Sequence, residues 1–499
     1  MGDDGTSASY PRDWPPTETG GQMSRSREIA KRRDRSVGHD CISPATRPEA
    51  TLILTLLLAC DSSPSETADD THVPPGDDCI PSDDALGAVE VVVTTMPTVL
   101  RATWSLDADA PARLRFVDST GRWVENEPGE GLMVGLLPNT DVPWQLVWEE
   151  GGEPRCSSVG SATTGPLSVP AVDVEGALAP GYVITPIIDT DSTLVLLDAL
   201  GNVVWSHEAD AELDEPMIRA RLGRDRKSVL YHLRSNSSHE GEIVRLGLDG
   251  EEIARIPFPG IDIDWDELED GRIAGLNPEL RLYENGELVR GDRLVVTDGT
   301  TSVVLWNALD ALGPDLPYEV VEPSEGEVFQ EFSHCNGVSY DGEGFLISLG
   351  NLDGVARVAL DGRTEWVLRA DSPGFDLGPG EIVMPHSAMA VEGGVIVFNR
   401  GMEIDGTTSC ANATVFTLDQ EAHHAEASWS VTSDPCLVIS FLGHAQRLAG
   451  GETLVDYSSA GLLQQVENDG VITFNANLQA GSAFGFATHL GELGTPMAE

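Results

Sequence analysis

Leu360-Asp361-Gly362-Arg363-Thr364-Glu365-Trp366 is the stretch that decides the fold of this chain. An Asp-Gly pair between two alternating apolar segments is a strong signal for a β-hairpin. Related phrases begin at Leu197, Leu248, Val296, Leu418 and Val466. Successive copies lie about 50 to 60 residues apart, a spacing typical of the repeats that form propeller blades. Six copies therefore predict a six-bladed β-propeller, in which loops far apart in sequence meet at a central funnel.

The composition also favours short strands over long helices. The chain has 499 residues, 40% of them hydrophobic, with 52 Gly and 31 Pro. We therefore predict an all-β protein with two folded domains. Residues 85–168 alternate in strand-like segments and predict a small β-sandwich, and residues 169–499 form the predicted propeller. The segment 135–148 resembles the later half of fibronectin type III-like domains.

The charge balance excludes one class of partner. There are 82 Asp and Glu residues against 30 Lys and Arg, a formal net charge of -52. Such a surface repels nucleic acid, and no basic stripe offsets it. It also repels small anions, so a site for an anionic substrate needs basic groups gathered locally.

The N-terminal region reads as a targeting sequence. Residues 1–59 contain a basic block followed by the apolar run 52–58, which is too short to span a bilayer. Leu57-Leu58-Ala59-Cys60 resembles the bacterial lipobox, which implies lipidation of Cys60. Residues 60–84 read as an acidic, disordered tether. We expect an exported periplasmic or cell-surface lipoprotein that contacts the membrane through its lipid anchor alone; the sequence leaves the oligomeric state open.

Export places the remaining cysteines in an oxidising compartment. We predict disulfides between Cys79 and Cys156 and between Cys410 and Cys436, which leaves Cys335 as a free thiol. No Cys or His spacing supports zinc, so no metal site is predicted.

Three histidine-bearing stretches precede or begin predicted blades: His334-Cys335-Asn336, Pro385-His386-Ser387 and Gly443-His444-Ala445. Histidines at equivalent positions on inner strands would face one another across the funnel. A neutral imidazole acts as a nucleophile or a base near neutral pH. Each one taken alone is more often a structural histidine.

All three stretches resemble motifs of bacterial arylsulfate sulfotransferases, the third of them as Gly443-His444-Ala445 ahead of 450–453. His334-Cys335-Asn336, ahead of 346–348, is similar to their His-x-Asn signature, and Pro385-His386, ahead of 397–401, is similar to a second motif. The resemblance covers roughly residues 85–490. It implies a small β domain, a six-bladed propeller, and transfer of a sulfuryl group from an aryl sulfate to a phenol through a sulfated histidine, without a nucleotide sulfate donor or other cofactor.

The resemblance also implies roles for individual residues. His386 matches the histidine that becomes sulfated. His334 matches a histidine that binds the sulfuryl oxygens or moves the phenol proton, and Asn336 is its companion.

Two family residues are missing. Leu349 stands where the family has a sulfate-binding arginine, and Asp262-Ile263 stands where it has a further histidine. We hypothesise that Arg400, with Asn399 beside it, binds substrate and supplies the lost charge; a surface ion pair is the equal alternative for Arg400. For His444, a space-filling role is the stronger interpretation. The rival to an enzyme is a non-catalytic propeller that binds a ligand or a protein.

Overall fold

The computed structural model describes residues 79–107, 111–189, 192–208, 216–235, 240–313, 318–319, 329–370, 375, 377, 382–404, 407–491 and 493. The targeting region 1–59, with Cys60, lies outside these residues. The described residues fall within one compact unit. Strands dominate it, as predicted, and no described helix is long and apolar enough to cross a membrane.

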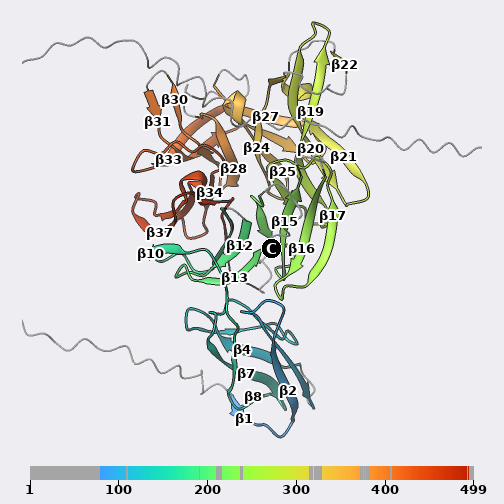
Figure 1. Ribbon diagram of the computed structural model, residues 1–499, viewed down its shortest axis with the longest axis vertical. Helices are drawn as coiled ribbons and strands as arrows, with labels where there is room; N and C mark the ends of the chain where they lie inside the picture. The colour runs from blue at the N-terminus through green and yellow to red at the C-terminus, as the bar shows by residue number, and fades with distance from the viewer. Residues whose placement is uncertain are drawn as a thin grey trace, which may run out of the picture. The chain divides into compact units, whose positions relative to one another are not determined.

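The N-terminal domain consists of two sheets that share one core (Figure 1). The larger sheet contains β1 (Ile80–Pro81), β8 (Glu153–Cys156), β7 (Asp141–Glu150), β4 (Arg113–Val117), β5 (Trp123–Glu125) and β9 (Gly160–Thr163). The smaller sheet contains β2 (Leu86–Val93), β3 (Leu100–Leu106) and β6 (Leu132–Met133). Inward-facing residues of both sheets, such as Ala102, Leu114 and Leu146, are almost fully buried, which is the packing of a β-sandwich.

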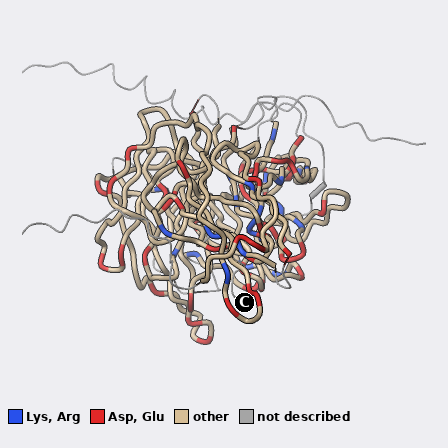
Figure 2. Tube along the Cα trace, turned by 90° about the horizontal axis from the view of Figure 1, so that it is seen from below, with Lys and Arg blue, Asp and Glu red and all other residues tan. Residues whose placement is uncertain are grey.

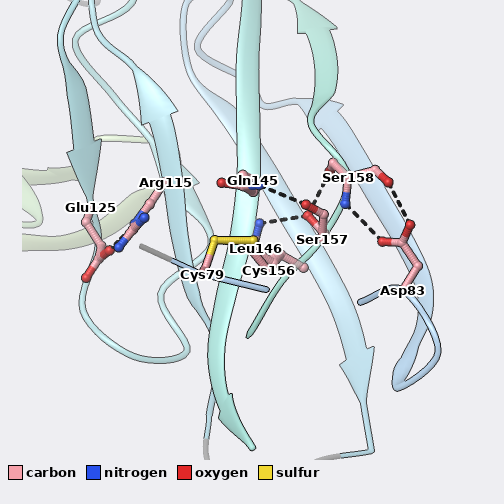
Figure 3. The surroundings of a disulfide bond; sticks show 9 residues. All are labelled: Cys79, Asp83, Arg115, Glu125, Gln145, Leu146, Cys156, Ser157 and Ser158. Carbon is pink, nitrogen blue, oxygen red and sulfur yellow. Dashed lines mark hydrogen bonds and ion pairs between the residues drawn. A yellow bond between two sulfur atoms is a disulfide. The ribbon is translucent and has the colours of Figure 1, made fainter. Parts of the chain in front are cut away.

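Both expected disulfides are present. Cys79–Cys156 ties the segment before β1 to the end of β8 beside the central strand β7 (Figure 3). The Asp83 carboxylate accepts hydrogen bonds from the backbone N–H and the hydroxyl of Ser158, at 2.9 and 2.6 Å. Residues 79–84, which we expected in the tether, are therefore anchored to the first domain.

Cys410–Cys436 closes a 26-residue excursion around one hairpin. Cys335 is free and buried. Burial, reinforced by the neighbouring Asp292 carboxylate, raises the pKa of the Cys335 thiol well above its usual value, so this thiol is an unreactive core residue.

Six further sheets, built mainly of antiparallel strand pairs, follow one another along the chain. Five of them have four strands in chain order, one of these with an inserted hairpin, whereas the first has three such strands and is completed by strands from the C-terminal end. In chain order they begin with β11 (Tyr182–Ile188), β12 (Ser192–Leu197), β13 (Val203–Glu208); then β14 (Ala220–Leu222), β15 (Ser228–Arg234), β16 (Gly241–Gly247), β17 (Glu252–Pro257); then β18 (Trp265–Glu267), β19 (Ile273–Tyr283), β20 (Leu288–Thr297), β21 (Ser302–Asn307). They continue with β24 (Cys335–Tyr340), β25 (Gly344–Leu349), β26 (Gly354–Ala359), β27 (Thr364–Arg369); then β28 (Pro385–Val391), β29 (Gly394–Asn399), β32 (Asn412–Asp419), β33 (His424–Thr432); then β34 (His444–Arg447), β35 (Thr453–Asp456), β36 (Leu462–Val466), β37 (Ile472–Leu478).

Short elements decorate these sheets: α1 (Ala308–Leu312), β22 (Tyr318–Glu319), β23 (Gln330–Glu331), the 3-10 turns η1 (Gly350–Leu352) and η2 (Ser458–Ala460), and the hairpin of β30 (Met402–Ile404) and β31 (Thr407–Ser409).

The hairpins predicted from the repeated phrase are confirmed. Each phrase joins the two outer strands of a sheet, and each of these strand pairs carries one register shift, a β-bulge. In the opening stretch, Gly362 has a φ of 83° and its amide donates to the carbonyl of Ala359. A β-carbon at Gly362 would lie 2.0 Å from the carbonyl oxygen of Leu305, so glycine is required for both conformation and space.

The first and last of the six sheets are joined by exchanged strands (Figure 1). β10 (Val172–Gly176) pairs with β37, at the outer edge of the last sheet. β38 (Ala483–Phe484) and β39 (Thr488–Leu490) both pair with β11 and supply the innermost position of the first sheet. This architecture is β-propeller-like.

The innermost strands are also tied to one another laterally. The Asp264 carboxylate accepts from the backbone N–H of Val338, and the hydroxyl of Ser339 donates to the carbonyl of Ala388. These contacts hold β18, β24 and β28 side by side, which positions the candidate site.

Acidic residues occupy many of the peripheral turns (Figure 2). Several arginines, by contrast, are buried, among them Arg219 at 2% exposure. Buried carboxyl groups, such as those of Asp264, Asp292 and Asp456, accompany these arginines, so acidic residues are not confined to the surface.

Candidate functional site

One buried residue from each of the six sheets stands at or beside the start of its innermost strand. These inner-strand residues are Arg219, Asp264, Asn336, His386, His444 and Phe486, and each is no more than 3% exposed. We refer to them as the inner ring. Three of the six come from stretches singled out by sequence.

Local backbone geometry explains how two of these side chains are directed. Asn336 and His386 each lie at a register shift between the first two strands of their sheets, so each occupies a bulge. The residue two positions earlier, His334 or Met384, has a φ of 46° in both cases. Bulges re-aim side chains that would otherwise follow the regular alternation of a strand.

His386 is the best-placed nucleophile in the inner ring. Its imidazole centroid lies 5.5 Å from the ring centroid of Phe486, and its Nδ1 has no hydrogen-bond partner among the residues that the structure describes. Burial, together with the charges of Arg400 and His334, holds the pKa of His386 well below its usual value. The imidazole is therefore neutral at pH 7 and carries a free lone pair.

His334 lies at the rim and not inside the ring. Its side chain is 29% exposed, and its Nδ1 lies 2.9 Å from the Glu331 carboxylate. The Glu331 carboxylate contacts Arg290 at 3.2 Å, and Arg290 contacts Asp262 at 2.8 Å. Asp262, which stands where the family has a histidine, thus anchors an ion-pair chain that leads to His334.

A pocket of about 470 Å³ opens beside this chain. Its lining includes Glu331, which contacts His334, and Met384, which precedes His386 by two positions, but neither histidine itself lines it.

Asn336, which the resemblance made the companion of His334, lies beside the start of the next sheet. Its Nδ2 donates to the carbonyl of Pro385, at 3.4 Å, while its Oδ1 has no hydrogen-bond partner within the described part of the chain. A β-carbon at Gly350 would lie 2.6 Å from Nδ2 of Asn336, so a glycine there leaves space for the amide.

The side chains of Arg400 and Asn399 have different kinds of hydrogen-bond partner. Nε of Arg400 donates to the carbonyl of Ile439, and no described carboxylate forms an ion pair with this guanidinium. Burial lowers its pKa, and its charge acts on His386. The amide of Asn399 bonds to the backbone N–H of Val383 and to the side chain of Asn412, so it supports the sheet.

His444 is buried, at 3% exposure. It lies edge-on to Phe486 with centroids 6.0 Å apart. Burial and the charges of Arg219 and Arg221 hold its pKa well below the usual value. Its cross-strand neighbour Asp456 is 1% exposed, and burial raises the pKa of this carboxyl to about 7.

Sequence reasoning missed Arg219, Phe486 and Asp456. The alternation of arginine with apolar residues over 217–222 marked a strand with one polar face, but no motif distinguished Arg219 from other surface arginines. Leu349, where the family arginine was expected, is fully buried in an apolar cluster. No group of His, Cys, Asp and Glu suited to hold a metal ion occurs among the residues with described positions.

No protein-family model and no curated protein matches this sequence. Solved structures with a similar fold include a protein of unknown function from Bacteroides caccae, at 10% identity and a TM-score of 0.39, covering 62% of this chain and 98% of that one. Virginiamycin B lyase from Staphylococcus aureus is similar at 11% identity and a TM-score of 0.34, covering 64% and 99%. A quinonprotein alcohol dehydrogenase-like protein from Bacteroides thetaiotaomicron is similar at 10% identity and a TM-score of 0.32, covering 84% and 98%. Similarity at this level carries no activity over to this chain.

Proposed function

We propose that this protein transfers a sulfuryl group from an aryl sulfate to a phenol, with His386 as the nucleophile. The observation that carries the proposal is the state of His386: a buried, neutral imidazole with an unpartnered Nδ1, acted on by the charge of Arg400. A nitrogen lone pair is needed to attack sulfur, and basic groups are needed to stabilise the sulfuryl oxygens.

The reaction has two displacement steps. In the first, an imidazole nitrogen of His386 attacks sulfur, the S–O bond to the aryl group breaks, and a phenolate leaves. In the second, the acceptor oxygen attacks the N–SO₃ group, the N–S bond breaks, and the acceptor proton passes to a base. His334, at the rim and bonded to Glu331, is our candidate for that base.

Incubation with an aryl sulfate, followed by a mass search of the digested protein, tests this proposal. We expect the mass of one SO₃ group on the peptide that contains His386 and no such label in His386→Ala. Absence of label and of transfer across a range of donors would rule the enzyme out.

Arg400 is proposed to lower the barrier by binding sulfuryl oxygens. Arg400→Ala should reduce transfer about ten- to a hundredfold, the usual effect of losing a charged hydrogen bond. Arg363→Ala is the matched control because Arg363 is exposed and pairs with Glu365 on an outer strand. Equal activities for the two variants would assign Arg400 to structure.

A binding propeller is the second candidate. Two observations favour it: Leu349 packs in an apolar core, and Asp262 is engaged with Arg234 and Arg290. This candidate predicts affinity for an aryl sulfate without turnover or label.

We further propose that the six sheets form a closed six-bladed ring and that the N-terminal domain is fibronectin type III-like. The exchanged strands β10, β38 and β39 support ring closure, because each joins an end of the domain to the opposite sheet.

Export and lipidation at Cys60 are also proposed. Two disulfides suit an oxidising compartment. Cells fed radiolabelled palmitate should label the wild type and not Cys60→Ser; equal labelling of both would contradict an anchor at this cysteine.

A further inference from the structure

Arg219 is a buried cation that the sequence motifs do not explain. It lies directly before β14 and forms an isolated bridge with Phe486 on the neighbouring innermost segment. Its guanidinium carbon stands 4.7 Å from the ring centroid of Phe486, a cation–π geometry. The same aromatic ring contacts His386 and His444 at 5.5 and 6.0 Å. The ring of Phe486 is therefore in contact with one guanidinium and two imidazoles.

The guanidinium is only partly compensated. Its Nε lies 3.0 Å from Oδ1 of Asp264, while its Nη1 is buried without a hydrogen-bond partner among the described residues. Asp264 is shared, because Arg221 lies 3.7 Å from the same oxygen and Val338 donates to the other one. A buried N–H donor without a partner is costly, and a bound ion is one of the explanations for keeping it.

The carboxylates around Arg219 do not accept a hydrogen bond from its Nη1. Asp264 accepts from the backbone N–H groups of Val338 and Trp265, and Oδ2 of Asp456 accepts from Ser458 and Ala487 at 2.9 and 3.1 Å. The charged groups that act on His444 are the guanidiniums of Arg219 and Arg221. This side of the inner ring thus holds the guanidiniums of Arg219 and Arg221 together with the carboxyl groups of Asp264, Asp266 and Asp456.

We infer that Arg219 is the oxyanion-binding arginine of the inner ring and that its Nη1 donates to an oxygen of a bound sulfate monoester. The inference deepens the proposed function, on which it rests for the identity of the ester. Asp264 and Phe486 hold the guanidinium in place, so that little conformational freedom is lost when the anion binds. Arg219 approaches from the second of the six sheets, whereas Leu349, at the vacant family position, lies on the fourth.

Equilibrium binding of inorganic sulfate to the full chain, measured by calorimetry, tests the inference. We expect the wild type to bind sulfate, Arg219→Gln to bind it at least about tenfold more weakly, and Arg219→Lys to be intermediate because it keeps the charge and loses the fork. Arg357→Gln is the matched control, since Arg357 is also buried but pairs with Asp341 on an outer part of its sheet. Sulfate affinity equal to wild type in Arg219→Gln, or no sulfate binding by the wild type, would overturn the inference.

A second variant keeps the inference testable if Arg219→Gln does not fold. Phe486→Leu keeps the charge and removes the aromatic platform, and it should weaken sulfate binding while the near-ultraviolet circular dichroism stays native. Unchanged sulfate affinity in a folded Phe486→Leu protein would contradict the claim that the aromatic ring of Phe486 holds the guanidinium in place.

The result separates this inference from the proposed function. Loss of sulfate binding in Arg219→Gln, with no SO₃ label on His386 in the wild type, would keep the anion site and reject the reaction. An SO₃ label on His386 in the wild type, with unchanged sulfate affinity in Arg219→Gln, would support sulfuryl transfer and rule out Arg219 as the oxyanion-binding residue.

Discussion

Replacing Asp456 by asparagine should make the protein more resistant to unfolding above pH 7. Asp456 is 1% exposed; its Oδ2 accepts two hydrogen bonds, and its Oδ1 has no partner. Burial is the main reason why its pKa rises from 3.8 to about 7 in the folded protein. Asparagine has nearly the same shape and can accept the same two bonds, but it carries no charge.

The sign and size follow from proton linkage. Between pH 4 and 7 the folded protein keeps a proton on Asp456 that the unfolded chain has lost, so the free energy of unfolding falls as the pH rises through this window. The loss of stability caused by Asp456 is absent below the pKa that this carboxyl has in the unfolded chain, and it is complete above pH 7. At 1.36 kcal/mol per pKa unit it reaches about 4 kcal/mol.

Urea unfolding at a series of pH values from 4 to 8, followed by tryptophan fluorescence, measures this effect. The difference in unfolding free energy between Asp456→Asn and the wild type should increase by roughly 3 to 4 kcal/mol across the series in favour of the variant. Glu175→Gln removes one exposed carboxylate and controls for the change in net charge. A difference that stays constant from pH 4 to 8 would refute the claim that Asp456 is held protonated by burial.

Three further changes test the packing around the site. Gly337→Ala should lower transfer at least about tenfold, because the new β-carbon would lie 2.8 Å from the carbonyl oxygen of His386 and displace the nucleophile. Cys410→Ser combined with Cys436→Ser should lower the free energy of unfolding by about 3 kcal/mol in denaturant titrations, the chain-entropy cost of opening a loop of this length. Leu349→Arg should lower the melting temperature without raising activity, because it buries an arginine in an apolar cluster.

Matched variants make these outcomes interpretable. Gly491→Ala is the control for Gly337→Ala, since a β-carbon there meets nothing closer than 3.9 Å. Leu349→Met keeps the volume without the charge. Full activity in Gly337→Ala, an unchanged denaturation midpoint in the double serine variant, or a gain of transfer in Leu349→Arg would each contradict the packing described here.

The sequence predicted features that depend on local chemistry. The Asp-Gly turns predicted the outer hairpins because a positive φ at Gly362 is a property of the turn itself. The cysteine pattern predicted both disulfides. His386 was predicted as the nucleophile because it lies within a short motif.

Features that depend on convergence of distant strands were missed. Arg219 and Phe486 are 267 positions apart in the numbering and meet only because the last strands pair with the first sheet. The elevated pKa of Asp456 likewise arises from burial by several sheets together. A single sequence carries no local signal for such contacts.

The central claim is that His386 takes the sulfuryl group before the acceptor does. The most direct measurement is rapid mixing of the protein with an excess of a chromogenic aryl sulfate in the absence of any phenol acceptor. We predict a burst of one phenolate per chain that is absent in His386→Ala, followed by turnover only when an acceptor phenol is added. Phenolate release that shows no burst, or an equal burst in His386→Ala, would contradict the account.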